Sequence, residues 1–201
     1  MILTIAIPTV NQRVKQFSSL YLYLNKQVID NNLTEKVEVI YEQDNKEISI
    51  GAKREKLHQR AKGNFTVTID DDDSVVDNFI NTLVDLIDVF PDCDCIGYIE
   101  EVTGNEVTQY SHISNIHKGW GDHVTVEDER YRYVRTPYFK NPILTKYLLE
   151  IGVQDMRYAE DKDFSDRLKA SGLIKNEVFL PRVMYHYRYK PEPHDSKYGI
   201  R

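Results

Sequence analysis

Residues 65–73, Phe-Thr-Val-Thr-Ile-Asp-Asp-Asp-Asp, join a short apolar run to four consecutive aspartates. The run at 65–69 is rich in β-branched and aromatic residues, which predicts a buried strand. Similar runs occur at 3–7 and 37–41. Each of these two is followed by a segment with helical character, at 14–27 and at 51–61. Strands that alternate with helices in this way predict an α/β fold with a parallel sheet.

After the aspartates, residues 74–90 predict a third helix of this alternating series, with Asp77 in a capping box. The second half of the chain predicts a different set of elements. They are a hairpin of 96–102 with 107–112, a strand at 131–136, helices at 141–151 and 160–170, and an extended segment at 178–189. We find no internal repeat and no Pro/Gly/Ser linker, and therefore expect a single domain.

Charge is unevenly distributed along the 201 residues. The net charge is −6, but residues 64–156 carry 6 Lys/Arg against 18 Asp/Glu, whereas both flanking segments are slightly basic. An acidic centre between basic ends suits a cation site whose anionic ligand is held from both sides, although a solvated acidic face has the same composition. The chain is not basic enough to indicate nucleic-acid binding.

Several features point to an intracellular location. Cys93 and Cys95 have no second pair and are expected to be reduced thiols rather than a bridge. The N-terminus lacks the basic start of a signal peptide, and no apolar run is long enough to span a membrane. We therefore expect a cytoplasmic protein.

The aspartates at 70–73 are the strongest chemical signal. Four adjacent carboxylates repel one another, which is tolerable only in water or beside a cation. Ligands bind at the carboxyl ends of strands in open parallel sheets, and carboxylate oxygens there suit Mg²⁺ or Mn²⁺. An acidic first turn of a helix would explain one or two of these aspartates, but not four. A second acidic pair, Glu160-Asp161, stands at a predicted helix start, where it fits capping and catalysis equally well.

Together, four segments resemble glycosyltransferase family 2, a group of nucleotide-sugar-dependent enzymes with the GT-A fold. In chain order they are residues 4–11, which resemble a Pro-Thr-x-Asn donor loop, Gly51-Ala52-Lys53-Arg54 with residues 61–65, the DxD-like aspartates 70–73, and Glu160-Asp161. Glu55 departs from the family, which has Asn there. The resemblance runs from residue 3 to about residue 190. It implies one GT-A (Rossmann-like) domain over 1–201, a three-layer α/β/α sandwich with a mostly parallel central sheet, divided into a nucleotide-binding half (1–115) and an acceptor half (116–201).

Carried over position by position, the resemblance also implies roles for individual residues. The nucleotide sugar is expected to contact Pro8, Thr9, Asp44, Lys53, Arg54, Asp70, Asp71 and Trp120. Mn²⁺ or Mg²⁺ is expected at Asp72, Asp70 and His186. Asp161 would be the general base, and the expected acceptor or lid residues are Glu160, Arg188 and Lys190. Trp120 is also compatible with a core anchor, and His186 with a structural role.

Alternation along 184–190 predicts that His186, Arg188 and Lys190 share one face of a strand. We expect this face to look toward the aspartates, with the residues after Pro191 forming a lid. The alternative is an edge strand whose basic residues only balance surface charge.

The activity implied is metal-dependent, inverting transfer of a sugar from a nucleotide diphosphate, with a UDP-sugar favoured, to a glycan or a hydroxymethylated DNA base. A non-catalytic nucleotide-sugar-binding module would keep the aspartates without needing Asp161. A two-metal nuclease is a further alternative. A sugar nucleotidyltransferase would need a Gly-rich loop after the first strand, which residues 7–12 lack.

Overall fold

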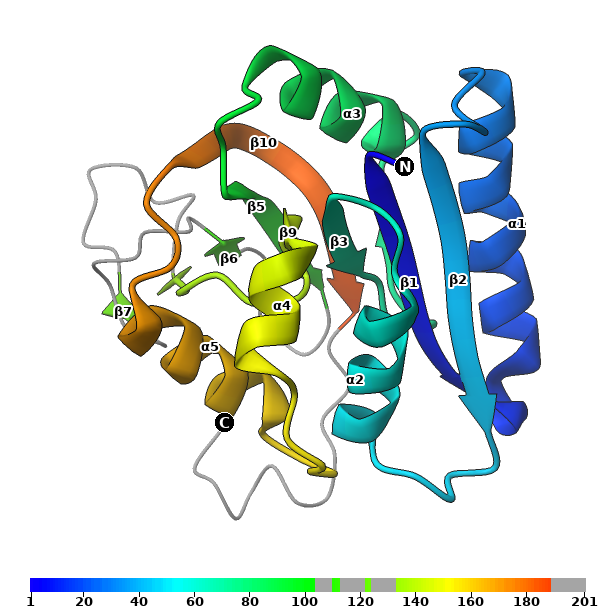
Figure 1. The fold of residues 1–201 in the computed structure, drawn as a ribbon. Coiled ribbons are helices and arrows are strands. Elements are labelled where there is room, and N and C mark those ends of the chain that lie inside the picture. Colours follow the sequence, from blue (N-terminus) through cyan, green and yellow to red (C-terminus); the bar gives the residue numbers. More distant parts are fainter. Residues whose placement is uncertain (104–109, 113–121, 124–132, 189–201) are drawn as a thin grey trace.

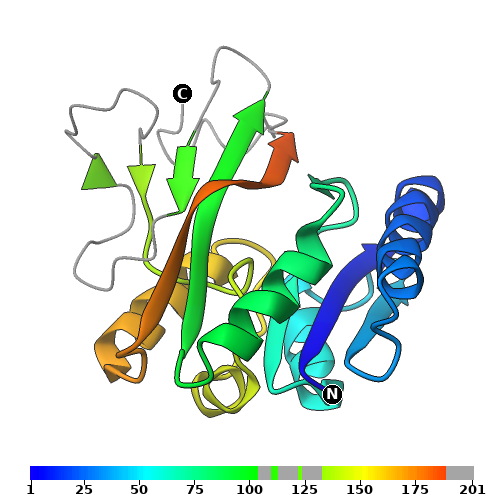
Figure 2. The same cartoon turned by 90° about the horizontal axis from the view of Figure 1, so that it is seen from above.

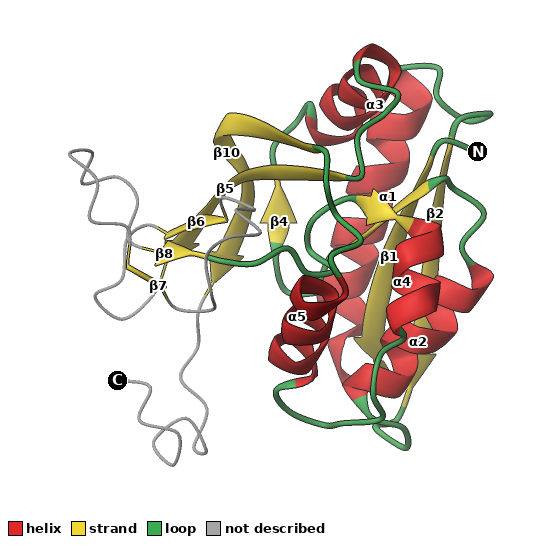
Figure 3. Cartoon of the chain, turned by 60° about the vertical axis from the view of Figure 1, so that its left-hand side comes forward, coloured by secondary structure: helices red, strands yellow, loops and turns green. Residues whose placement is uncertain are grey.

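The computed structural model describes residues 1–103, 110–112, 122–123 and 133–188, and its middle layer is a curved sheet (Figure 1). The strands of this sheet are β1 Leu3–Val10, β2 Val37–Asp44, β3 Phe65–Thr68, β4 Ser74–Val75, β5 Cys95–Thr103, β6 Tyr110–His112, β9 Ile143–Leu144 and β10 Glu177–Arg188. Their order is β2-β1-β3-β9-β5-β10-β4, with β6 paired to β5. Two short strands, β7 Asp122–His123 and β8 Tyr133–Val134, pair with each other and lie near β6 (Figure 3).

Two parallel groups make up most of the sheet. β1 pairs in parallel with both β2 and β3, which confirms the parallel arrangement expected of the first three strands. β5 and β10 run side by side in the same direction (Figure 2). β9 joins the two groups through antiparallel pairing with β3 and β5, and β4 is antiparallel to β10.

Helices cover both faces of the sheet. They are the 3₁₀ helix η1 Asn11–Arg13 and the α-helices α1 Val14–Asp30, α2 Ile50–Arg60, α3 Phe79–Val89, α4 Thr145–Ile151 and α5 Glu160–Ser171. Leu3, Ile5 and Ile7 of β1 share one apolar core with side chains of α1 and α3. A second core, which includes Phe139 and Phe164, packs against α4 and α5, and α2 contacts α4 on that side. The α/β/α sandwich is therefore confirmed.

The ends of α2 and α5 follow local sequence signals. Ser49 caps α2 by accepting a hydrogen bond from the Ala52 amide at 3.0 Å. Gly172 ends α5 with a φ of 64°, a left-handed conformation that glycine adopts without a Cβ penalty. The helices expected at 51–61 and 160–170 are confirmed to within one residue at each end.

The helix expected from Ser74 begins only at Phe79. Residues 74 and 75 instead form β4, because β10 offers them a strand partner. The predicted capping box is wrong as well, since the Asp77 carboxylate accepts a hydrogen bond from the Tyr23 hydroxyl at 2.7 Å. The Asp77 carboxylate therefore makes a long-range hydrogen bond in place of the local bond of a capping box.

The segment at 141–151 shows the same effect. Its first part pairs with β3 and β5 as β9, so α4 begins at Thr145. By contrast, the antiparallel pairing of the predicted hairpin is confirmed, because β5 and β6 pair through Tyr98 and His112.

Cys93 and Cys95 are both buried free thiols, as expected. They belong to different apolar cores on opposite faces of the sheet. Among the described residues, no helix combines the length and apolar character that crossing a bilayer requires.

Gly63 allows the chain to turn closely against β1. A Cβ at this position would lie 2.4 Å from the Thr4 nitrogen and 2.6 Å from the Leu3 carbonyl carbon, both backbone atoms. Because backbone cannot move aside as a flexible side chain can, we expect Gly63→Ala to lower the free energy of unfolding by about 1–3 kcal/mol. Urea denaturation measures this free energy. Gly172→Asn is the control, because Asn tolerates the left-handed conformation that Gly172 adopts. A change below about 0.5 kcal/mol for Gly63→Ala would contradict it.

Candidate functional site

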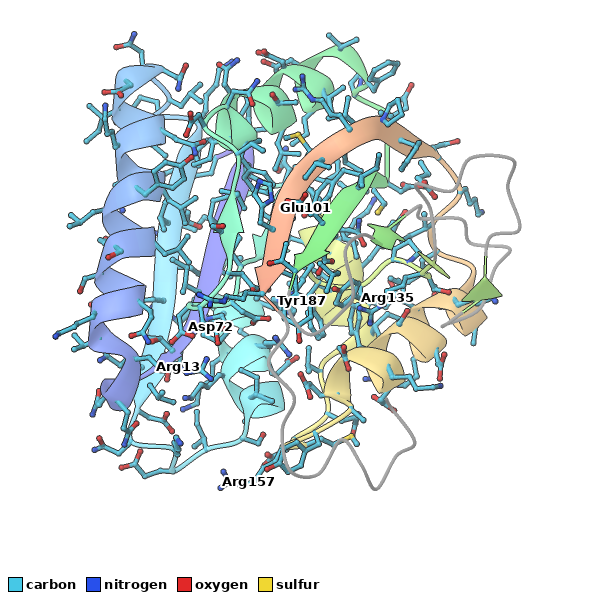
Figure 4. All side chains as sticks on the ribbon, turned by 180° about the vertical axis from the view of Figure 1, so that it is seen from behind. Arg13, Asp72, Glu101, Arg135, Arg157 and Tyr187 are labelled. Carbon is cyan, nitrogen blue, oxygen red and sulfur yellow. The ribbon has the colours of Figure 1, made fainter. Side chains whose placement is uncertain are left out.

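A pocket of about 430 Å³ opens at the carboxyl ends of β1 and β3. It is lined by Pro8, Thr9, Val10, Arg13, Lys46, Ile48, Ile50, Lys53, Arg54, Asp70, Asp71, Asp72, Arg157, Tyr158, Tyr187 and Arg188. Six of these residues are basic and three are acidic, so the pocket suits an anionic ligand. Figure 4 shows Arg13 beside Asp72, with Tyr187 at the end of β10 and Arg157 on the outer side.

The aspartates at 70–73, here called the acidic loop, are largely neutralised by the chain itself. Asp70 pairs with Arg54 at 2.7 Å and with Lys140 at 3.5 Å. Burial alone would raise the pKa of the Asp70 carboxyl, but the two cations outweigh it and lower this pKa to about 2. The buried Asp73 pairs with Lys140 at 2.8 Å and accepts a hydrogen bond from the Tyr185 hydroxyl at 2.6 Å. Basic side chains of this protein therefore supply part of the positive charge that four adjacent carboxylates require.

The other two aspartates face Arg13. Its guanidinium lies 2.8 Å from the Asp71 carboxylate and 3.2 Å from that of Asp72. Asp71 is buried and also accepts from the Thr9 hydroxyl at 2.7 Å, whereas the Asp72 side chain is 24% exposed. Asp72 is thus the aspartate of this pair that presents more of its carboxylate to the pocket.

Lys140 is a site residue that the sequence did not reveal. It lies 67 residues from Asp73 along the chain, yet its ammonium is buried between the acidic loop and the rings of Tyr185 and Tyr187. Burial would lower the pKa of Lys140, but Tyr185, Asp73 and Glu100 raise it well above its usual value, so the side chain is charged. No local pattern distinguishes this lysine from a surface one.

Arg54 and Glu160 form a buried ion pair that joins α2 to α5. Because Arg54 also donates to Asp70, it ties the acidic loop to α2. Glu160 was expected to face an acceptor or a lid, and this expectation stays a prediction. Its side chain is only 8% exposed and its carboxylate is used by Arg54.

Asp161, the next residue, remains accessible. Its side chain is 33% exposed, and Arg135 lies 3.2 Å from its carboxylate. Asp161 is not part of the pocket wall, but its neighbour Glu160 bonds to the pocket-lining Arg54, so it lies beside the pocket. The preceding Ala159 has a φ of 60°, a left-handed conformation that is uncommon for a residue with a side chain.

Of the residues predicted to contact the nucleotide sugar, Pro8, Thr9 and Lys53 line the pocket, but Asp44 does not. The Asp44 carboxylate pairs with Lys53 and accepts from the Ile48 amide at 2.9 Å. Burial opposes ionisation, but Lys53 and the backbone amides lower the pKa of Asp44 to about 2. Lys53 also donates to the Thr9 carbonyl at 2.7 Å, so this pair fixes the pocket-forming end of β1.

The face of β10 that carries His186 was expected to meet the acidic loop, but the opposite face, which carries Tyr185, does so. Tyr185 and Tyr187 point toward the loop and Lys140, while His186 Nδ1 bonds to Glu101 at 2.7 Å. The alternation itself is correct, since the two tyrosines share a face. Arg188 does line the pocket, but Trp120 and Lys190 lie outside the described residues.

A metal ion at Asp72, Asp70 and His186 stays a prediction. Within the ranges that the structure describes, no group of three or more His, Cys, Asp or Glu side chains is arranged to hold a metal. A site of this kind would need oxygen atoms from the ligand to complete it, as is common for Mg²⁺.

Comparisons with known proteins identify the fold. No family model matches the sequence, and no curated protein matches it. Among solved structures, TarS 1–349 of S. aureus in complex with UDP-GlcNAc is similar, with a TM-score of 0.65 and 18% identity over 98% of this chain and 61% of that one. TarS 1–349 in complex with UDP gives a TM-score of 0.66 at 18% identity, over 100% of this chain and 63% of that chain. This chain therefore spans about three fifths of the length of those structures, and the similarity shows that it has the GT-A fold.

Proposed function

We propose that this protein transfers a sugar from a nucleotide diphosphate to an acceptor hydroxyl, with a divalent cation at Asp72. The observation that carries the proposal is the pocket itself. It places the accessible carboxylate of Asp72 among six basic side chains at the carboxyl edge of the sheet. An aspartate and cationic side chains together fit a diphosphate that binds with a divalent cation, because Asp72 would hold the cation and the basic groups would balance the remaining negative charge of the phosphates.

Residues 1–115 supply most of the donor pocket in this proposal, and Arg157, Tyr158, Tyr187 and Arg188 of the proposed acceptor half (116–201) complete its wall. Arg54 and Lys140 hold Asp70, while Thr9 and Arg13 hold Asp71, so the loop carrying Asp72 is fixed before any ligand arrives. Mn²⁺ or Mg²⁺, when bound, neutralises charge that develops on the leaving diphosphate. Since the structurally similar TarS was solved with UDP-GlcNAc and with UDP, UDP-GlcNAc is the first donor to test.

Asp161 is the proposed general base. Its carboxylate lies at the accessible start of α5, where it takes the proton from the acceptor hydroxyl as that oxygen attacks the anomeric carbon. Attack from the face opposite the leaving group inverts the anomeric configuration. The proposed acceptor is the hydroxyl of a glycan or of a hydroxymethylated DNA base.

Binding of UDP by the protein tests the donor site directly. We expect Mn²⁺ to increase UDP affinity by at least tenfold, and Asp72→Asn to remove this increase because the amide no longer supplies an anionic ligand. Calorimetry with Mn²⁺ and with excess chelator measures both effects. Asp88→Asn is the control, since Asp88 pairs with Lys36 on the surface and lies outside the pocket. Equal UDP affinity with and without chelator would exclude the bridging metal.

A further inference from the structure

Arg13 differs from the other two cations that the described residues place against the acidic loop. Arg54 and Lys140 have side chains only 6% and 8% exposed, and each is held by several groups. The Arg13 side chain is 44% exposed, and it projects into the pocket from η1 at the end of β1. Arg13 can therefore change rotamer without opening a buried cavity.

The two carboxylates that Arg13 bridges differ in exposure. Asp71 is 3% exposed and also accepts a 2.7 Å hydrogen bond from the Thr9 hydroxyl, a contact that does not involve Arg13. Asp72 is more exposed and is paired with Arg13 at 3.2 Å. If Arg13 moved, the charge balance at Asp72 would change while the backbone of the acidic loop stayed anchored.

A divalent cation at Asp72 would meet Arg13 directly. Two positive groups within about 4–6 Å of each other disfavour one another, so Arg13 in its observed position opposes metal binding. A guanidinium can also donate to two phosphate oxygens at once. The other basic side chains of the pocket line the same cavity as Arg13, so a diphosphate would bind within reach of it. A diphosphate entering with the metal offers Arg13 a new anionic partner.

We propose that Arg13 is an exchangeable counterion: it occupies the metal position at Asp72 in the ligand-free protein and moves to the diphosphate when metal and ligand bind together. This inference rests on the proposed function for the identity of the anion, but not for the competition with metal. Arg13 thereby links the two ligands, because neither alone both displaces it from Asp72 and gives it a new partner. Metal and diphosphate should bind cooperatively.

The test compares wild type with Arg13→Gln in two titrations. In the first, Mn²⁺ is added without nucleotide, and we expect the variant to bind Mn²⁺ about three- to tenfold more tightly because the competing cation is gone. In the second, UDP is added at saturating Mn²⁺, and we expect the variant to bind UDP about tenfold more weakly. A purely structural role for Arg13 would weaken both, so opposite signs are diagnostic.

Two further variants control for charge and shape. Arg13→Lys keeps the charge and should keep the weak Mn²⁺ binding of the wild type. Arg60→Gln removes a comparably exposed arginine of α2 that pairs with Glu42 of β2, outside the pocket, and should change neither titration.

The outcomes separate this inference from the proposed function. Equal Mn²⁺ binding by wild type and Arg13→Gln, including no binding by either, would overturn the counterion role. If Arg13→Gln binds Mn²⁺ more tightly but UDP binds neither protein, the competition stands and the assignment of the diphosphate donor fails. If UDP binds both equally well, Arg13 does not move to the diphosphate and the exchange is wrong.

Discussion

Replacing Asp161 with Asn is expected to lower the rate of sugar transfer by roughly 10²-fold or more, because an amide cannot take the acceptor proton. UDP affinity should hardly change, since Asp161 does not line the donor pocket. Stability should also be preserved, because the side chain is accessible and Asn has nearly the same shape. Product formation with saturating donor, measured across acceptor concentrations, separates an effect on kcat from one on acceptor binding.

A matched control lies two residues away. Asp163 is also 33% exposed and also pairs with an arginine, Arg167, at 2.7 Å. Asp163→Asn should therefore leave the transfer rate within a factor of about two. If Asp161→Asn transfers sugar as fast as Asp163→Asn, Asp161 is only a helix-start residue and the proposed inverting mechanism loses its general base.

Replacing Arg54 with Met is expected to lower the free energy of unfolding by about 3–5 kcal/mol, since it leaves Glu160 and Asp70 without their shared buried cation. The guanidinium also packs 4.2 Å from the centre of the Phe139 ring, a contact that Met replaces only in part. Chemical denaturation gives the value.

The physical cause can be isolated with a second substitution. Adding Glu160→Gln to Arg54→Met removes one of the uncompensated carboxylates, so the double variant should be more stable than Arg54→Met alone. Arg60→Met is the surface control, because Arg60 is 51% exposed and pairs only at the surface with Glu42 among the described contacts. A loss below about 1 kcal/mol for Arg54→Met, similar to that of Arg60→Met, would show that the pair is dispensable.

The sequence by itself determined the strands and helices whose signals are local. Apolar runs predicted β1 and β3, Gly172 fixed the end of α5, and the acidic loop was correctly placed at the edge of the sheet where the pocket opens. These features depend on residues within one or two turns, so their physical causes are visible in a short window of sequence.

Only the tertiary structure decided where segments find distant partners. β4 replaced the first turn of a predicted helix because β10 could pair with it, and β10 itself shifts register between Leu180 and Tyr185. Alternation shows which residues share a face of β10, but not which face meets the acidic loop. Each one-residue shift in register exchanges the two faces of a strand. From Leu180 to Tyr185, β10 advances five residues while β5 advances two, from Tyr98 to Glu100, and the tyrosines rather than His186 meet Asp73.

The partners of the aspartates were also decided by the tertiary structure. The sequence indicated that four adjacent carboxylates need positive charge, but Arg13 and Lys140 lie 58 and 67 residues from the aspartates with which they bond. Electrostatic attraction depends on distance in space, and chain separation carries no information about it until the sheet has formed. The sequence therefore indicated that the aspartates need nearby positive charge. The fold determined which basic side chains supply this charge and how exposed each of these side chains is.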